Sequence, residues 1–381
     1  MNEIPARRLW FAVLCGYLAL GATLQELPGY VVSRFSAGPA AAGLAVGLAF
    51  AATAATRPFA GRAADGGLAR PVVLAGALLT TLAALAHLLA PDFGVLLLAR
   101  LVMGAGEGAL FSGALPWVLT GTPADRRGRT AGWFGLSMWG GLSAGPLLAV
   151  AMRQAGGPAA VWWTVVALPL VSVLLVASTR GQAHRSPVLP RSARDLVPAG
   201  AGLPGLVLGL SAYGYGSLTA LLVLYLSEER VGGENLGLAV FAAAFLLTRS
   251  VGSPLVDRHG GLAVARVVLV VEAAGLVLLA AAPGEVVALL ATAVTGVGIG
   301  LIYPAATSVT LHRTGALGPG VAVGAMTSFW DLGILVAGPL GGLVAAELGY
   351  RSAFGLAAAL AVLAFGVTYA VAPQVLPVMR S

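Results

Sequence analysis

Five ionisable residues stand inside long apolar stretches of this sequence, far from any polar segment: Glu26, Arg100, Glu107, Glu272 and Asp331. A charge in an apolar layer is costly, so such groups are rare and usually bind or transfer something. A buried carboxylate takes up a proton more readily than an exposed one, and a nearby arginine opposes that uptake. A carboxylate whose arginine partner moves can therefore take up a proton and release it again.

The spacing of these residues separates the candidates. Arg100 and Glu107 are seven residues apart, which places them two turns apart on one helix face. Glu26 is expected at about the depth of Arg100, and Asp331 is expected on a face that also carries a Gly-Pro bend. We therefore expect these four residues to bind protons or a substrate. Glu272 is expected to form a structural pair or to extend its carboxylate towards the membrane surface (snorkelling) instead.

The elements that must position these groups are apolar helices. Of the 381 residues, 58% are hydrophobic and only 10% are charged, whereas an ordinary soluble domain has about 25% charged residues. Charged residues are rarely buried, so this composition excludes a soluble enzyme, a nucleic-acid binder and a disordered regulator as descriptions of the whole chain. Apolar stretches long enough to cross a bilayer occur at 9–32, 39–60, 71–90, 94–120, 130–152, 159–178, 202–226, 236–256, 263–282, 285–311, 319–346 and 352–372. The sequence thus predicts an all-α membrane protein with twelve transmembrane helices.

The distribution of arginines predicts the orientation. All 22 basic residues are arginines, and with the N-terminus inside, 17 of them fall on the cytoplasmic side or in the last helical turns before it. The positive-inside rule then places both termini in the cytoplasm and the protein in the cell membrane as a multi-pass protein. The polar stretch 180–200 separates six spans from six spans. We expect an N-terminal bundle over 1–179, a cytoplasmic linker over 180–200 and a C-terminal bundle over 201–381.

The second half of the chain repeats the first at a nearly constant offset of 192 residues. Three features recur: an arginine and an aspartate eight residues apart, alternating glycines, and a Gly-Pro pair. The first copies are Arg57 with Asp65, Gly104 to Gly108, and Gly145-Pro146; the second are Arg249 with Asp257, Gly296 to Gly300, and Gly338-Pro339. The repeat keeps the glycines. At the positions equivalent to Arg100, Glu107 and Glu26, however, the second half has Thr, Ile and Leu. We therefore expect the N-terminal half to carry the principal charged site.

Two parallel six-span halves joined by a basic linker resemble the major facilitator superfamily over essentially the whole chain. The superfamily's loop signature, Gly-x-x-x-Asp followed by basic residues, matches Gly61, Asp65 and Arg70, and the second copy contains Asp257 and Arg258. The resemblance implies a cytoplasmic latch that locks the two halves together when the transporter is open outward. The expected latch residues are Arg57, Gly61, Asp65, Arg70, Arg249, Asp257 and Arg258.

The resemblance extends to spans four and five. The span-four signature Arg-x-x-x-Gly-x-Gly appears from Arg100, and the span-five signature of the proton-antiporting drug exporters appears as Gly141, Gly145 and Pro146. Proline bends a helix, and glycines one turn apart let another helix approach closely. These residues, with Gly338-Pro339 in the second half, are therefore expected to form a pivot between the halves.

Aromatic residues are expected to line a cavity between the halves: Tyr30, Phe111, Trp139, Tyr213, Tyr303 and Trp330. Many aromatic groups and few charges suit a hydrophobic or amphipathic molecule better than a sugar phosphate or an inorganic anion. The favoured interpretation is proton-coupled export (antiport) of such a molecule, for example a drug or secondary metabolite, by alternating access. Two alternatives remain open: an uptake symporter of a small metabolite, and a transporter-like receptor or scaffold without turnover.

The sequence offers little for enzyme chemistry. The chain has no lysine and hence no Gly-x-x-x-x-Gly-Lys nucleotide loop. Its single cysteine, Cys15, lies in an apolar stretch, so neither a disulfide framework nor a cysteine metal site is expected. We expect no enzyme activity, catalytic residue, cofactor, metal or nucleic-acid partner. The expected partners are a small-molecule substrate, protons and the lipid bilayer, and the protein is expected to be a monomer.

Overall fold

The structure, a computed structural model, describes residues 4–123, 127–179, 200–314 and 319–371. Most of the predicted linker and the side chain of Asp65 lie outside the described residues. The described chain is helical: α1 (Ala6–Phe35), α2 (Pro39–Ala63), the short η1 (Ala64–Leu68), α3 (Ala69–Leu89), α4 (Phe93–Thr120), α5 (Arg127–Ala177), α6 (Gly202–Glu228), α7 (Gly237–His259), α8 (Gly261–Ala280), α9 (Glu285–Thr314), α10 (Pro319–Leu348) and α11 (Tyr350–Ala370). Within these residues, eleven helices are long and apolar enough to cross a membrane.

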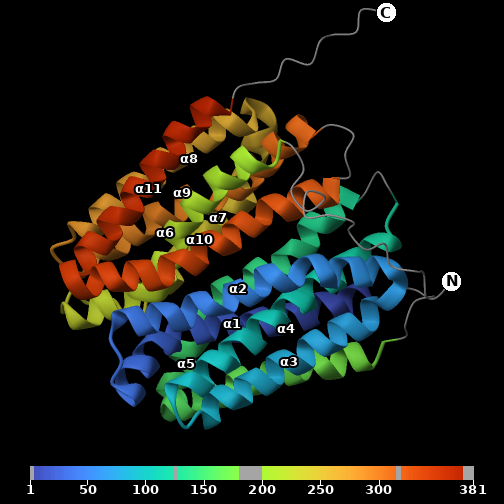
Figure 1. Cartoon of the computed structure of the whole chain (residues 1–381), viewed down its shortest axis with the longest axis horizontal. Coiled ribbons are helices and arrows are strands. Elements are labelled where there is room, and N and C mark those ends of the chain that lie inside the picture. Colours follow the sequence, from blue (N-terminus) through green and yellow to red (C-terminus); the bar gives the residue numbers. More distant parts are fainter. Residues whose placement is uncertain (1–3, 124–126, 180–199, 315–318, 372–381) are drawn as a thin grey trace, which may run out of the picture.

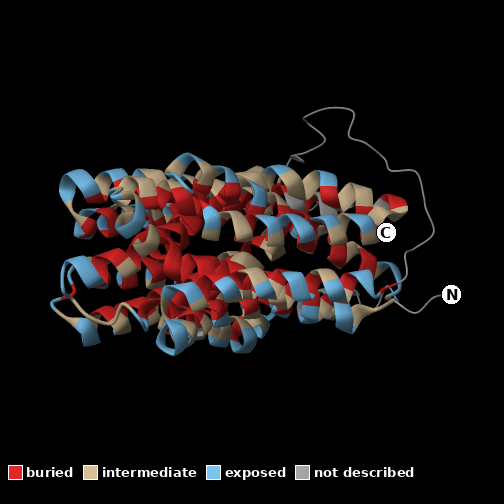
Figure 2. Cartoon of the chain, turned by 90° about the horizontal axis from the view of Figure 1, so that it is seen from below, coloured by how far each residue is buried: buried red, intermediate tan, exposed pale blue. Residues whose placement is uncertain are grey.

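The helices form two layers. Helices α1 to α5 make up one layer and α6 to α11 the other, with α2 and α10 along the boundary between them (Figure 1). Buried residues gather on the inner faces of both layers, while exposed residues lie mainly on the outer faces (Figure 2). The exposed outer positions include large apolar side chains such as Leu82, Leu174 and Val286, as expected for helices whose outer surface faces lipid rather than water.

Helix α5 consists of two arms that run in opposite directions. Its 51 residues contain two positions outside helical geometry, Gly156 and Gly157, and the latter has φ 70° and ψ −169°. Before this point, the backbone oxygen of Trp133 accepts a hydrogen bond from Trp10 Nε1 at 3.0 Å. After it, Ser172 Oγ donates to the backbone oxygen of Ala12 at 2.7 Å. The chain has therefore returned to the same level of α1, and the predicted spans 130–152 and 159–178 are the two arms of α5.

Helices α2 and α10 meet across the boundary between the layers through glycines. A Cβ atom added to Gly43 would overlap the carbonyl group of Gly338, and one added to Gly47 would lie 2.8 Å from the backbone oxygen of Leu335. The two backbones are thus in direct contact over one end of each helix, an approach that small residues alone permit. This contact fixes the distance between α2 and α10 at the boundary between the two layers.

The Gly-Pro pairs of the two halves occupy different environments. A Cβ atom on Gly145 would lie 2.5 Å from Gly21 Cα, so the glycine face of α5 packs on α1 within the same half. The predicted pivot between the halves therefore has a partner across the boundary at Gly338 but not at Gly141 or Gly145. The backbone around Pro146 stays helical, because the non-helical dihedral angles within α5 are confined to Gly156 and Gly157.

Candidate functional site

A cavity of about 560 Å³, partly open to solvent, lies at the boundary between the two layers. Side chains from both halves line it: Tyr17, Leu20, Phe50, Thr53, Arg57, Glu107, Phe111, Met138, Trp139 and Leu142 from the first, and Tyr215, Tyr303, Thr327, Trp330 and Asp331 from the second. Four of the predicted aromatic residues and two of the predicted acids are thus brought together here.

An ion pair joins the two halves in this cavity. Arg57 Nε on α2 donates to Asp331 Oδ2 on α10 at 2.9 Å, and the two residues are 274 positions apart in the chain. The carboxylate is 1% exposed and the arginine side chain 19%. The second carboxylate oxygen, Asp331 Oδ1, is buried without a hydrogen-bond partner. Asp331 therefore depends on an arginine of the other half for its charge compensation.

A second acid lines the same cavity. Glu107 on α4 is 2% exposed, and its Oε1 is buried without a hydrogen-bond partner. The hydroxyl of Tyr17 on α1 donates to the backbone oxygen of Glu107 at 3.3 Å, so it does not satisfy the carboxylate. Glu107 is therefore a proton-binding candidate that shares its cavity with the ion pair of Arg57 and Asp331.

Arg100 forms no salt bridge with Glu107 or Glu26 in the described residues, and the coupling role of these three residues stays a prediction. Arg100 is fully buried, and its Nε donates to the backbone oxygen of Ala45 at 2.8 Å. Its Nη2 donates to the backbone oxygen of Val46 at 3.4 Å, and its Nη1 contacts a methionine sulfur of its own helix. A guanidinium whose donors are used by the α2 backbone holds α4 on α2. These hydrogen bonds of Arg100 could not be predicted from the sequence, because backbone acceptors are present in every helix.

Glu26 forms its own ion pair at one end of the bundle. Arg153 Nη1 donates to Glu26 Oε1, with the arginine side chain 52% exposed and the glutamate 6%. The neighbouring Gln25 Nε2 donates to the backbone oxygen of Glu234 at 3.1 Å and so reaches the second half. Glu26 thus lies at the rim of the bundle and does not line the central cavity described above.

The residues grouped as a latch lie at different places in the structure. Arg70 donates to the backbone oxygens of Thr179 and Ala177 at 2.9 and 3.0 Å, so it caps the end of α5 in its own half. Asp257 and Arg258 are exposed at the end of α7. The side chain of Asp65 lies outside the described residues, so its latch role stays a prediction.

Gly61, another residue of the expected latch, leaves space beside it, since a Cβ atom there would be 3.9 Å from the nearest atom.

The two equivalent arginines of the repeat, Arg57 and Arg249, point towards the centre instead. Arg57 pairs with Asp331 as described. Arg249 Cζ lies 4.6 Å from the ring centroid of Trp139, 5.1 Å from that of Tyr303 and 5.8 Å from that of Phe245. Both guanidinium groups therefore lie away from Asp257 and Arg258, at the rings and acid of the central region, and the latch stays a prediction.

Two predicted cavity aromatics lie elsewhere. The Tyr30 hydroxyl donates to the backbone oxygen of His87 at 3.2 Å, and its ring packs on Trp162 within the first half. Tyr213 is buried on α6 beside α10. Residues two apart in a helix point in nearly opposite directions, so only one of Tyr213 and Tyr215 can face the cavity. In the structure, Tyr215 lines it.

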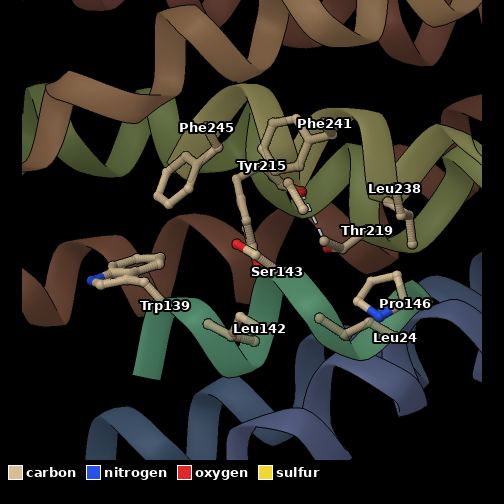
Figure 3. Close-up of a pocket in the computed structure, with 11 residues that line it drawn as sticks. Leu24, Trp139, Leu142, Ser143, Pro146, Tyr215, Thr219, Leu238, Phe241 and Phe245 are labelled. Atoms are coloured by element: carbon tan, nitrogen blue, oxygen red, sulfur yellow. Dashed lines mark hydrogen bonds between the residues drawn. The ribbon is translucent and has the colours of Figure 1, made fainter. Parts of the chain in front are cut away.

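A second cavity of about 340 Å³ adjoins the first and shares Trp139, Leu142 and Tyr215 with it. Figure 3 shows its lining of apolar side chains around Ser143 and Thr219, with Pro146 of the span-five signature among them. Thr219 Oγ1 donates to the backbone oxygen of Tyr215 at 3.1 Å, which occupies its donor. This cavity therefore continues the central one as a largely apolar compartment.

Comparison with protein families and curated proteins gives consistent results. The family model of the major facilitator superfamily matches residues 9–335 and 205–378. An uncharacterized MFS-type transporter of Burkholderia mallei is 33% identical over 359 residues, which cover 90% of this chain and 86% of the relative. An uncharacterized MFS-type transporter of Salmonella typhimurium is 31% identical over 383 residues, covering 97% and 96%.

Solved structures share the fold at low sequence identity. The nucleoside transporter NupG superposes with a TM-score of 0.79 at 12% identity, covering 96% of this chain and 99% of its own. A bacterial homolog to the human lysosomal transporter Spinster gives 0.77 at 15% identity, covering 97% and 98%. The human organic anion transporter MFSD10 gives 0.69 at 15% identity, covering 96% and 100%. At these identities the likeness concerns the fold alone.

Proposed function

Since the chain belongs to the major facilitator superfamily of membrane transporters, we propose that it is a proton-coupled exporter of an amphipathic organic molecule. The observation that carries this proposal is the ion pair of Arg57 and Asp331, which joins the two halves inside the cavity. Alternating access moves one half against the other around a central site. A carboxylate compensated only across that boundary is coupled directly to the movement.

The coupling follows from the environment of the carboxylate. While the halves are together at this point, Arg57 favours the ionised form of Asp331. When they separate, the carboxylate remains in an apolar site without its cation, and proton uptake is then favoured. Glu107, in the same cavity and with an oxygen lacking a partner, supplies a second group that can hold the proton.

The cavity lining supports an amphipathic substrate. Rings of Tyr215 and Trp330 lie 5.4 Å apart, and those of Trp139 and Trp330 lie 5.9 Å apart, so the wall is an aromatic surface with a few ionisable groups. Such a surface binds the apolar body of a ligand through burial and ring contacts.

The proposal includes the topology that the arginine distribution predicts. The two arms of α5 count as two passes, so the chain crosses the membrane twelve times with both termini in the cytoplasm. Residues 1–179 and 201–381 form the two moving bundles, and 180–200 connects them in the cytoplasm. The transporter works as a monomer in the inner membrane, and Asp65 and Asp257 contribute to a cytoplasmic latch.

Proton-coupled export is tested in inverted membrane vesicles that contain the protein and carry an imposed pH gradient. Toxic lipophilic compounds that an exporter-deficient host tolerates only when it expresses this chain serve as substrates. Their addition should dissipate the gradient, and Asp331→Asn should abolish the effect. Glu229→Gln, at an exposed ion pair with Arg351, is the matched control and should retain activity. Compound efflux that ignores the gradient would contradict proton coupling.

The same assay separates export from uptake symport. In antiport the proton moves against the substrate, whereas in symport both move in one direction. A substrate that enters the cytoplasm together with protons would replace the proposed export by uptake of a small metabolite.

A further inference from the structure

Arg249 is a partly exposed cation at the boundary between the halves that forms no ion pair with any residue that the structure describes. Its guanidinium donates no hydrogen bond to any residue in the described part of the chain, and its Nη1 is shielded from solvent without an acceptor. Its contacts there are the rings of Trp139, Tyr303 and Phe245. Trp139 and Tyr303 line the central cavity, and Trp139 and Phe245 line the adjoining one.

The internal repeat shows what is missing at this position. Arg57 and Arg249 are equivalent at the offset of 192 residues. Each arginine contacts a residue of the opposite half: Arg57 meets Asp331 on α10, and Arg249 meets Trp139 on α5. Arg57 finds a carboxylate there, whereas Arg249 finds an indole ring. The second site therefore has the cation and an aromatic platform but lacks the anion.

The other arginines that stack on rings in the described structure are not in this condition. Arg34 lies over Tyr30 and Phe35 and also donates to the backbone oxygen of Ala90 at 3.3 Å. Arg266 lies over a tyrosine ring and donates to Thr368 Oγ1 at 3.0 Å. Stacking therefore does not by itself leave a guanidinium without acceptors, and the open donors of Arg249 need a separate explanation. A cation held among apolar groups without an anion is costly.

We propose that Arg249 binds the carboxylate of the transported molecule while Trp139, Tyr303 and Phe245 hold an aromatic or other flat apolar body beside it. The planar guanidinium presents paired donors that match the two oxygens of a carboxylate. The three rings that it contacts line the two cavities, which places the guanidinium beside them. This inference rests on the proposed function and makes its substrate an amphipathic organic anion.

The test uses the purified full-length protein in detergent and matched pairs of ligands. The probes are benzoate, 2-naphthoate and indole-3-acetate, each with its neutral amide, and affinities are measured by isothermal titration calorimetry. At least one carboxylate should bind about tenfold or more tightly than its amide, the range of a charge-assisted hydrogen-bonded pair. If no carboxylate in this panel exceeds its amide by that factor, the proposal is overturned.

Arg249→Gln should remove this preference and leave the affinity for the amide within about twofold, because the aromatic platform remains. Arg34→Gln is the matched control, since it removes an arginine stacked on two rings outside the cavities, and it should keep the preference. If Arg249→Gln does not fold, Arg249→Lys is measured instead and should lower the preference several-fold, because a lysine lacks the planar fork. An unchanged preference in the variant that folds would overturn the proposal.

The outcome is distinguishable from that of the proposed function. Gradient-driven export of neutral compounds that Arg249→Gln leaves unchanged would overturn the inference and retain the proposed function. Carboxylate binding that depends on Arg249 without any proton movement in vesicles would support the inference and contradict proton coupling.

Discussion

Neutralising Asp331 should destabilise the protein more than neutralising Arg57. The two groups form one ion pair, with the carboxylate 1% exposed and the arginine 19%. Asp331→Asn leaves a guanidinium that cannot lose its proton in a largely apolar site. Arg57→Gln leaves a carboxylate, which can become neutral by binding a proton. The charge left by Asp331→Asn therefore cannot be neutralised by proton transfer, whereas the charge left by Arg57→Gln can.

The magnitude follows from the geometry. Opposite charges about 4 Å apart attract by about 4 kcal/mol at the effective dielectric constant of about 20 that suits protein sites. The partial exposure of Arg57 reduces this value through solvent screening, to about 3 kcal/mol. We therefore expect Asp331→Asn to cost about 3 kcal/mol and Arg57→Gln about 1–2 kcal/mol, within the range for breaking buried pairs. The double variant should cost less than the sum of both, with a coupling of at least about 2 kcal/mol.

The assay is reversible unfolding in mixed micelles with increasing sodium dodecyl sulfate, followed by helical circular dichroism. Wild type, both single variants and the double variant complete a thermodynamic cycle. The exposed pair of Arg351 and Glu229 gives a matched control cycle, whose side chains are 49% and 31% exposed. Its coupling should be below about 1 kcal/mol. Additive losses at Arg57 and Asp331 would refute the reasoning, because the pair would then have no energetic link between the halves.

Three further predictions concern packing and the predicted motifs. Gly338→Val should abolish transport, because a side chain there overlaps the backbone at Gly43, whereas Gly355→Val, which meets no atom within 4 Å, should leave vesicle transport unchanged. Arg70→Gln should lower the free energy of unfolding by about 1–2 kcal/mol, because the end of α5 loses its capping hydrogen bonds. Transport per folded molecule should be retained, and loss of transport without loss of stability would instead favour a latch role for Arg70. Arg100→Gln should lower the free energy of unfolding by about 3 kcal/mol by leaving α2 carbonyls without donors, and an unchanged unfolding curve would contradict the structural role.

Composition and periodicity determined the class of this protein and the positions of its helices. Apolar stretches of sufficient length can only be membrane helices, because each must satisfy its backbone hydrogen bonds internally. The repeat and its glycines identified two related halves and the superfamily to which the chain belongs. The cost of charge in an apolar layer marked Glu107 and Asp331 as special before any fold was known.

The pairing of these groups was decided by tertiary structure. A helix face can be read from spacing, but which neighbour that face meets depends on how two halves dock. Arg57 was therefore grouped with the loop signature beside it, although its partner is 274 residues away. Arg100 was expected to meet acids and meets backbone carbonyls, which every helix offers and no sequence pattern marks. Arg249 stands among the rings of Trp139 from the other half and of Tyr303 and Phe245 from its own half, a set that comes together only when the two halves dock. Local sequence fixes what a side chain can do, and only the docking of the two halves decides which partner it has.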